Sequence, residues 1–135
     1  MTNLPSLQSI DFGQNCFNGA SSFSLIGFPQ LQSVKLGNKA FQGTTSFELS
    51  IFPSLQSIEI GDSCFSGYAT YYYSILYVKA FSLIDLPQLQ SVKLGNKAFQ
   101  NAQSFELSNL PSLQSIEIGG DGFIGFYYFG QQKWV

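Results

Sequence analysis

Residues 4–17 read Leu-Pro-Ser-Leu-Gln-Ser-Ile-Asp-Phe-Gly-Gln-Asn-Cys-Phe, and this pattern of proline, apolar and glycine positions returns four more times along the chain. The repeats start at Leu4, Phe28, Phe52, Leu86 and Leu110, so successive starts lie 24, 24, 34 and 24 residues apart. A period of this length is typical of a solenoid, in which each unit buries its apolar face only against its neighbours. The sequence therefore predicts one continuous stack of turns.

Each repeat contains two short segments in which apolar residues alternate with other residues. The first includes Leu55, Ile58 and Ile60, and a glycine, here Gly61, ends it. Period-2 alternation indicates a strand with one buried face, and glycine permits a turn that a side chain would obstruct. The second segment reads Ser-Phe-x-Leu. We therefore predict a β-rich repeat solenoid, with a parallel sheet of one short strand per 24-residue turn, a second short strand or extended wall opposite, and phenylalanines such as Phe65 between them.

The length of 135 residues leaves room for one domain, which we predict to be a single array over residues 1–135. Its predicted units are 4–27, 28–51, 52–85, 86–109 and 110–135. The third unit contains a Tyr-rich insertion at about residues 68–79, and the last has a divergent tail.

Composition excludes several classes of protein. Hydrophobic residues make up 44% of the chain and charged residues 10%, which is too apolar for a disordered segment. No stretch approaches the roughly 18 consecutive apolar residues of a membrane-spanning helix, so no membrane span is predicted. The net charge is -2 and there is no Arg, so nucleic acid is not an expected partner. Residues 1–3 lead directly into the first repeat, and we expect no secretory signal within this chain.

Residues 55–65 follow the frame Leu-x-x-Ile-x-Ile-x-x-Ser-x-Phe, which resembles leucine-rich repeats. Residues 36–41, Leu-Gly-Asn-Lys-Ala-Phe, are similar more particularly to BspA-type leucine-rich repeats. One departure is that the asparagine of the common frame is present only as Asn15. The resemblance implies a binding or adhesion role and an extracellular or cell-surface location, because that family includes cell-surface and adhesion proteins of bacteria and protists.

One outward strand position carries charges whose sign alternates from turn to turn. These residues are Asp11, Lys35, Glu59, Lys93 and Glu117. Neighbouring strands lie about 4.8 Å apart, so each charge would have opposite charges on both sides. Two interpretations remain open. The column is a contact surface for a charged ligand, or it is a self-neutralising exposed face in which each pair contributes only ~0.2–1 kcal/mol.

The outward residues hardly differ between turns, and residues 28–51 match residues 86–109 at 19 of 24 positions. A receptor for one irregular epitope would need different residues from turn to turn. We therefore expect a non-enzymatic recognition or adhesion module for a protein or a glycan, with a repetitive polymer as the better-fitting ligand. The alternative is a structural subunit that binds further copies of itself and stacks end to end into a filament, or a fragment of a longer array.

We predict no catalytic, cofactor-binding or metal site. The chain has no His, so its cysteines form neither a Cys–His nucleophile nor a convincing zinc site. Carboxylates two turns apart, such as Asp11 and Glu59, have a lysine between them that would keep both ionised, whereas a general acid must hold a proton.

The two cysteines, Cys16 and Cys64, occupy the same repeat position two turns apart, where Ala40 and Ala98 stand in other units. Two strand spacings separate their Cα atoms by about 10 Å, while a disulfide allows at most about 7 Å. We therefore expect two buried, reduced thiols.

The insertion in the third unit concentrates tyrosines. The candidate contact residues are Tyr71, Tyr72, Tyr73 and Tyr77. Tyrosine favours interfaces because it combines a large rigid apolar ring with a polar tip. The alternative is a hairpin that folds back on the solenoid wall and covers apolar surface there.

Overall fold

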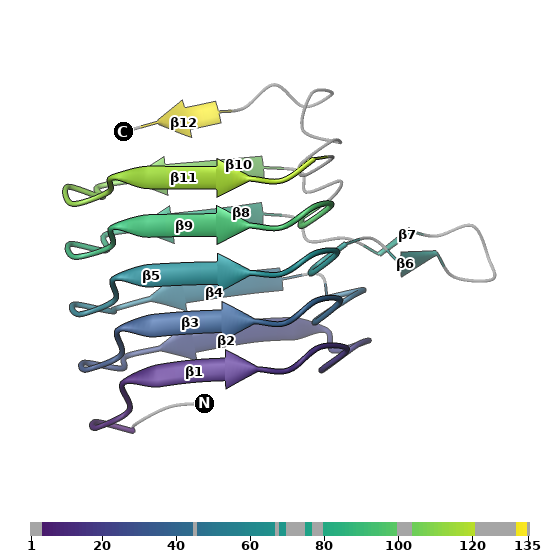
Figure 1. Ribbon diagram of the computed structural model, residues 1–135, viewed down its shortest axis with the longest axis horizontal. Helices are drawn as coiled ribbons and strands as arrows, with labels where there is room; N and C mark the ends of the chain where they lie inside the picture. The colour runs from purple at the N-terminus through teal and green to yellow at the C-terminus, as the bar shows by residue number, and fades with distance from the viewer. Residues whose placement is uncertain are drawn as a thin grey trace.

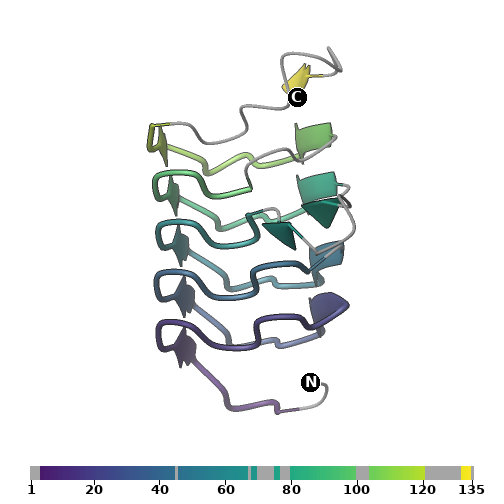
Figure 2. The same ribbon diagram turned by 90° about the vertical axis from the view of Figure 1, so that its right-hand side faces the viewer.

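The computed structural model of the chain describes residues 4–44, 46–66, 68–69, 75–76, 80–99, 104–120 and 132–134. In this part of the chain two sheets of short parallel strands face each other across a narrow core, as Figure 1 and Figure 2 show. The chain alternates between the two sheets as it climbs from turn to turn. The predicted β-rich repeat solenoid is confirmed.

The first sheet takes one strand from each repeat, in the order β1-β3-β5-β9-β11. The strands are β1 (Ser9–Phe12), β3 (Ser33–Leu36), β5 (Ser57–Ile60), β9 (Ser91–Leu94) and β11 (Ser115–Ile118). Every neighbouring pair is parallel and in register over four residues. In β5 the inward side chains of Ile58 and Ile60 are buried while Glu59 is exposed, as the alternating pattern predicts.

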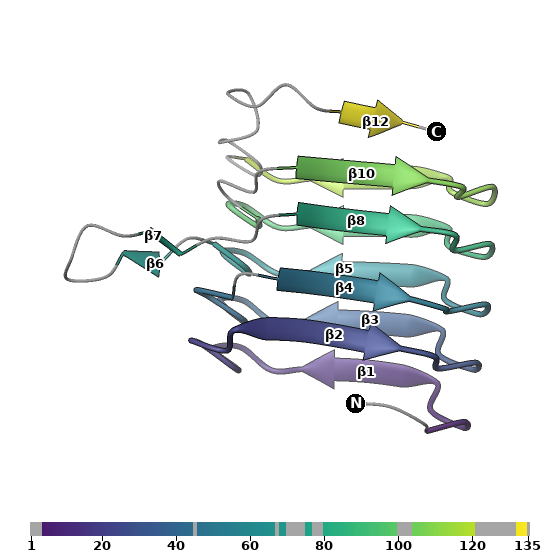
Figure 3. The same ribbon diagram turned by 180° about the vertical axis from the view of Figure 1, so that it is seen from behind.

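The second sheet forms the opposite wall, in the order β12-β10-β8-β4-β2 (Figure 3). The strands are β2 (Ser22–Ile26), β4 (Ser46–Ser50), β8 (Ala80–Ile84), β10 (Ser104–Ser108) and β12 (Gln132–Trp134). The pairs β2–β4 and β8–β10 are in register over five residues. The pair β4–β8 is joined at one position, where Leu49 lies opposite Leu83. The ladder of the second sheet is therefore shortest where the long third unit interrupts the 24-residue period.

The described residues of the insertion lie outside both sheets. Its described residues form two short strands, β6 (Tyr68–Ala69) and β7 (Ile75–Leu76), which pair antiparallel in a sheet of their own. Figure 1 and Figure 3 show this pair beyond the ends of the sheet strands, on the side where β4 and β8 begin.

Phenylalanines stack along the core. The ring of Phe65 lies parallel to that of Phe41 with centroids 5.2 Å apart, and to that of Phe99 with centroids 4.8 Å apart. All three side chains are buried. The prediction that each such residue fills the interior is wrong for Phe17, which is 55% exposed because no described turn packs beneath the first repeat.

The glycine that ends each strand of the first sheet is required by the stacking of the turns. A Cβ atom at Gly61 would lie 2.8 Å from the backbone nitrogen of Asn38 and 2.9 Å from the carbonyl carbon of Gly37, in the turn below. At Gly13, in the first turn, the same atom would meet only the Cys16 Sγ at 3.9 Å. The predicted obstruction is confirmed, and its source is the backbone of the preceding turn.

Candidate functional site

The charge column predicted from the sequence is present on the outer face of the first sheet. Parallel pairing places Asp11 opposite Lys35, Lys35 opposite Glu59, Glu59 opposite Lys93, and Lys93 opposite Glu117. All five residues are exposed. Every charge therefore has charges of opposite sign on the neighbouring strands.

These charges are not held in close ion pairs. Within the described residues no lysine ammonium lies within 4.0 Å of a carboxylate oxygen. Exposed pairs at longer separations stabilise a fold only weakly because water screens them. The side chains of the column consequently remain free to reorient toward a ligand.

The turns beside this face are joined by side-chain bonds that sequence reasoning missed. The Asn38 Oδ1 accepts a hydrogen bond from the Asp62 N–H at 2.9 Å, and the Asp62 Oδ1 accepts one from the Asn96 N–H at 2.8 Å. The Asn96 Oδ1 continues the series with the N–H of Gly120. The residues of this series occupy the repeat position just before the asparagine of the common frame. The recurrence of Asn and Asp at that position is the feature of the sequence from which these bonds could have been predicted.

The Cys64 thiol is buried and is not a reactive nucleophile at neutral pH. Its Sγ donates a hydrogen bond to the Gly37 carbonyl oxygen at 2.9 Å. Burial raises the pKa of the Cys64 thiol from 9.0 to about 11, so the thiol is protonated at neutral pH. Both thiols are free, as predicted. The prediction of burial is wrong for Cys16, which is half-buried because no described turn packs beneath the first turn.

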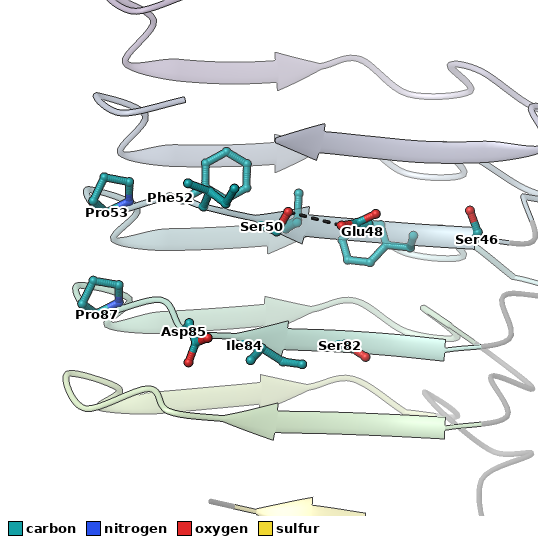
Figure 4. A pocket seen from close by; sticks show the side chains of 12 residues that line it. Ser46, Glu48, Ser50, Phe52, Pro53, Ser82, Ile84, Asp85 and Pro87 are labelled. Atoms are coloured by element: carbon teal, nitrogen blue, oxygen red, sulfur yellow. Dashed lines mark hydrogen bonds between the residues drawn. The ribbon is translucent and has the colours of Figure 1, made fainter. Parts of the chain in front are cut away.

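The opening between β4 and β8 forms a groove of about 800 Å³ (Figure 4). It is lined by residues 46–53, Ser82, Ile84, Asp85 and Pro87. Its acidic groups are already oriented, since the Ser50 hydroxyl donates to Glu48 Oε1 at 3.2 Å and the Asn109 side-chain amide donates to Asp85 Oδ1 at 2.7 Å. The lining contains these two carboxylates and no basic side chain.

Ile51, at the rim of this groove, has an unusual backbone. Its φ is 61°, in the left-handed region, and its side chain is 66% exposed. The same position is occupied by Gly27, Asp85 and Asn109 in other turns, also with positive φ. Gly, Asp and Asn adopt this conformation readily, whereas for a β-branched residue it costs about 1–3 kcal/mol. Exposure gives no compensating burial, so the fold alone does not account for isoleucine here.

The remaining candidate residues, Tyr71, Tyr72, Tyr73 and Tyr77, lie outside the described residues. Within the described part of the chain, no cluster of three or more His, Cys, Asp or Glu side chains is placed to hold a metal ion. The described residues also contain no helix that is both long and apolar enough to cross a membrane.

A model of the BspA type leucine-rich repeat region matches residues 2–121 of the chain, in six copies. The resemblance seen in the sequence is therefore confirmed. Leucine-rich repeats generally mediate protein interactions, and the family is generally non-enzymatic. No curated protein and no solved structure matches the chain.

Proposed function

We propose that this chain, which belongs to the BspA-type leucine-rich repeat family, is a non-enzymatic recognition or adhesion module for protein or glycan ligands. The exposed, in-register charge column of the first sheet is the observation that carries the proposal. Residues of like sign, such as Lys35 and Lys93, stand two strands apart, or about 10 Å. A polymer whose charges repeat at this interval would meet equivalent groups along the whole face.

The test is a variant in which the column is inverted but still alternates. Its substitutions are Asp11→Lys, Lys35→Glu, Glu59→Lys, Lys93→Glu and Glu117→Lys. Each charge keeps opposite neighbours, so the circular dichroism and the melting temperature should match those of the parent chain. Parent and variant are then compared on one array of anionic and cationic oligosaccharides. We expect the variant to lose the glycans that the parent binds, and an identical array profile would exclude the column as the contact surface.

We also retain the tyrosines of the insertion as proposed contact residues. Replacing Tyr71, Tyr72, Tyr73 and Tyr77 together with serine changes neither the repeats nor the charge column. Loss of binding in this variant, with an unchanged melting temperature, would assign the contact to the insertion. Unchanged binding would exclude these tyrosines as the contact residues.

Self-assembly is a second candidate function, favoured by the exposed apolar side chains near the outer strands of the first sheet. Leu4, which precedes β1 in the chain, is 46% exposed, and Ile118, the last residue of β11, is 41% exposed. If β1 of one copy paired with β11 of another in the register of the array, Asp11 would lie opposite Glu117. Like charges directly opposite each other are destabilising. The substitution Glu117→Lys should therefore promote end-to-end association in light scattering if this pairing occurs, and no change would exclude that register.

A further inference from the structure

The groove between β4 and β8 differs from the rest of the second sheet in its backbone hydrogen bonds. In two other turns the residue after the strand donates its N–H to the next strand, from Gly27 to the Ser50 oxygen at 3.2 Å and from Asp85 to the Ser108 oxygen at 3.1 Å. The corresponding bond, from the Ile51 N–H to the Ile84 oxygen, is not formed. The Ile51 N–H and the Ile84 carbonyl oxygen are therefore a backbone donor and a backbone acceptor at the groove whose counterparts in the other two turns bond to each other.

The side chains of the groove combine two chemistries. Ile51 and Ile84 expose aliphatic surface, and Ile51 does so from a backbone conformation that disfavours isoleucine. Glu48 and Asp85 supply negative charge on the two walls, with no basic side chain in the lining. Backbone strain at an exposed residue is an observation from which a functional hypothesis can be drawn, and Ile51 and Ile84 together expose apolar surface in the same groove.

We propose that this groove binds an extended peptide segment in which an aliphatic residue is flanked by lysine or arginine. The aliphatic side chain packs against Ile51 and Ile84, and the basic side chains reach Glu48 and Asp85. A carbonyl group of the peptide backbone accepts the hydrogen bond of the Ile51 N–H, which lies two residues beyond the paired position of Leu49 and Leu83. The inference rests on the proposed recognition function and names a second surface for it, besides the charge column, together with a partner class.

The side chains favour a peptide over a glycan. The aromatic residues of the lining, Phe47 and Phe52, are 7% and 0% exposed, so no aromatic face is available for a sugar ring to stack on. A second copy of the chain is a weaker candidate, since the carboxylates of the groove would need a basic aliphatic strand. Lys35 and Lys93 lie within the paired strands β3 and β9, and Lys133 on the outer strand β12 stands between Gln132 and Trp134, neither of which is aliphatic.

The experiment is an NMR titration of the isotope-labelled chain with the acetylated and amidated peptide Gly-Lys-Ile-Lys-Ile-Lys-Gly. We expect the largest shift changes at Ile51, Glu48, Ile84 and Asp85. A peptide with glutamate in place of lysine, and a chitosan tetramer that carries positive charge without aliphatic side chains, should leave these resonances unchanged.

Two substitutions at equivalent positions provide a matched pair. Ile84 and Ile26 both alternate with serine in one column of the second sheet, but only Ile84 lines the groove. Ile84→Ser should weaken peptide binding about tenfold, as expected for removing an aliphatic contact, while Ile26→Ser leaves it unchanged. Glu48→Gln should weaken binding and reduce its dependence on salt, with Glu106→Gln on β10 as its control.

The substitution Ile51→Asn separates binding from stability. Asparagine suits the left-handed backbone, so the melting temperature should rise while the peptide affinity falls. A variant that lost binding because it unfolded would show the opposite change in melting temperature.

Several results would overturn the proposal. These are an unchanged spectrum at millimolar peptide, equal affinities of the Ile84→Ser and Ile26→Ser variants, groove shifts caused by the chitosan tetramer, and groove shifts that follow protein concentration without peptide. Peptide shifts confined to the first sheet would exclude the groove but support the recognition function. The inverted charge column tests that function independently.

Discussion

The Asp62 carboxylate accepts a hydrogen bond from the Asn96 N–H at 2.8 Å, which ties the third turn to the fourth across the 34-residue unit. Its substitution by alanine should lower the free energy of unfolding by about 1 kcal/mol, the usual net value of one hydrogen bond. Asp62→Asn should be nearly neutral, because Asn38 and Asn96 make the same bond in their own turns. Urea denaturation measures both, and equal losses in the two variants would show that the bond contributes nothing.

Glycine at the end of each first-sheet strand should tolerate substitution only where no turn lies beneath. Gly61→Ala forces a Cβ atom to within 3 Å of the Gly37 and Asn38 backbone, which cannot move as a flexible side chain can. We expect a loss of about 1–3 kcal/mol or more, as for other overpacked sites. Gly13→Ala is the control, since its Cβ would make only ordinary contact with Cys16. Equal melting temperatures for the two variants would contradict this account.

The buried Cys64 thiol should make stability depend on alkaline pH. Its pKa is raised from 9.0 to about 11 in the folded chain, so unfolding releases the proton between these values. The contribution is fully present below pH 9 and is lost as pH rises toward 11, at about 1.4 kcal/mol per pH unit.

The variant Cys64→Ala isolates this effect, because the two proteins share every other residue. Alanine occupies the same position as Ala40 and Ala98, so the variant should fold. The parent chain should lose more stability than the variant between pH 9 and 11. Thiol labelling at pH 8 adds a second readout, in which the half-buried Cys16 reacts before Cys64.

Removal of the insertion should close the groove. Deleting Ala69 to Val78 restores the 24-residue spacing at which β2–β4 and β8–β10 pair over five residues. The Ile51 amide should then exchange with solvent more slowly than in the parent chain, because it regains an acceptor on β8. The amides of Gly27 and Asp85 serve as internal controls. An unchanged exchange rate at Ile51 would mean that the opening does not depend on the insertion.

The sequence was sufficient for the strands and for the columns that they form. Alternation around Ile58 and Ile60 fixes which face is buried, and parallel stacking follows from the constant period, so Lys35 and Glu59 could be placed as neighbours. The Asn38–Asp62 ladder could not be derived in the same way. A side-chain bond to the backbone of the next turn depends on the offset between turns, which the repeat pattern does not define.

Two other structural features could not be predicted from the sequence, for different reasons. The length of the insertion showed that one turn is irregular, but not that β4 and β8 would pair at one position while β5 and β9 pair over four residues, because it does not say which sheet is affected by the extra residues. The exposure of Phe17 and of Cys16 reflects their place in the first turn, whereas the repeat pattern predicts the same burial for every unit. The functional role of the charge column and of Tyr71, Tyr72, Tyr73 and Tyr77 stays a prediction.

The alternation of Asp11, Lys35, Glu59, Lys93 and Glu117 limits how an array of this kind can change in length. Removing one regular unit, such as residues 86–109, would bring Glu59 opposite Glu117 at the strand spacing of about 4.8 Å. Removing two adjacent units, such as residues 28–85, would bring Asp11 opposite Lys93 and preserve the alternation. An insertion preserves the alternation only if it also contains an even number of units. The unit of growth of this solenoid is therefore a pair of turns, and the 24-residue repeat is half of its electrostatic period.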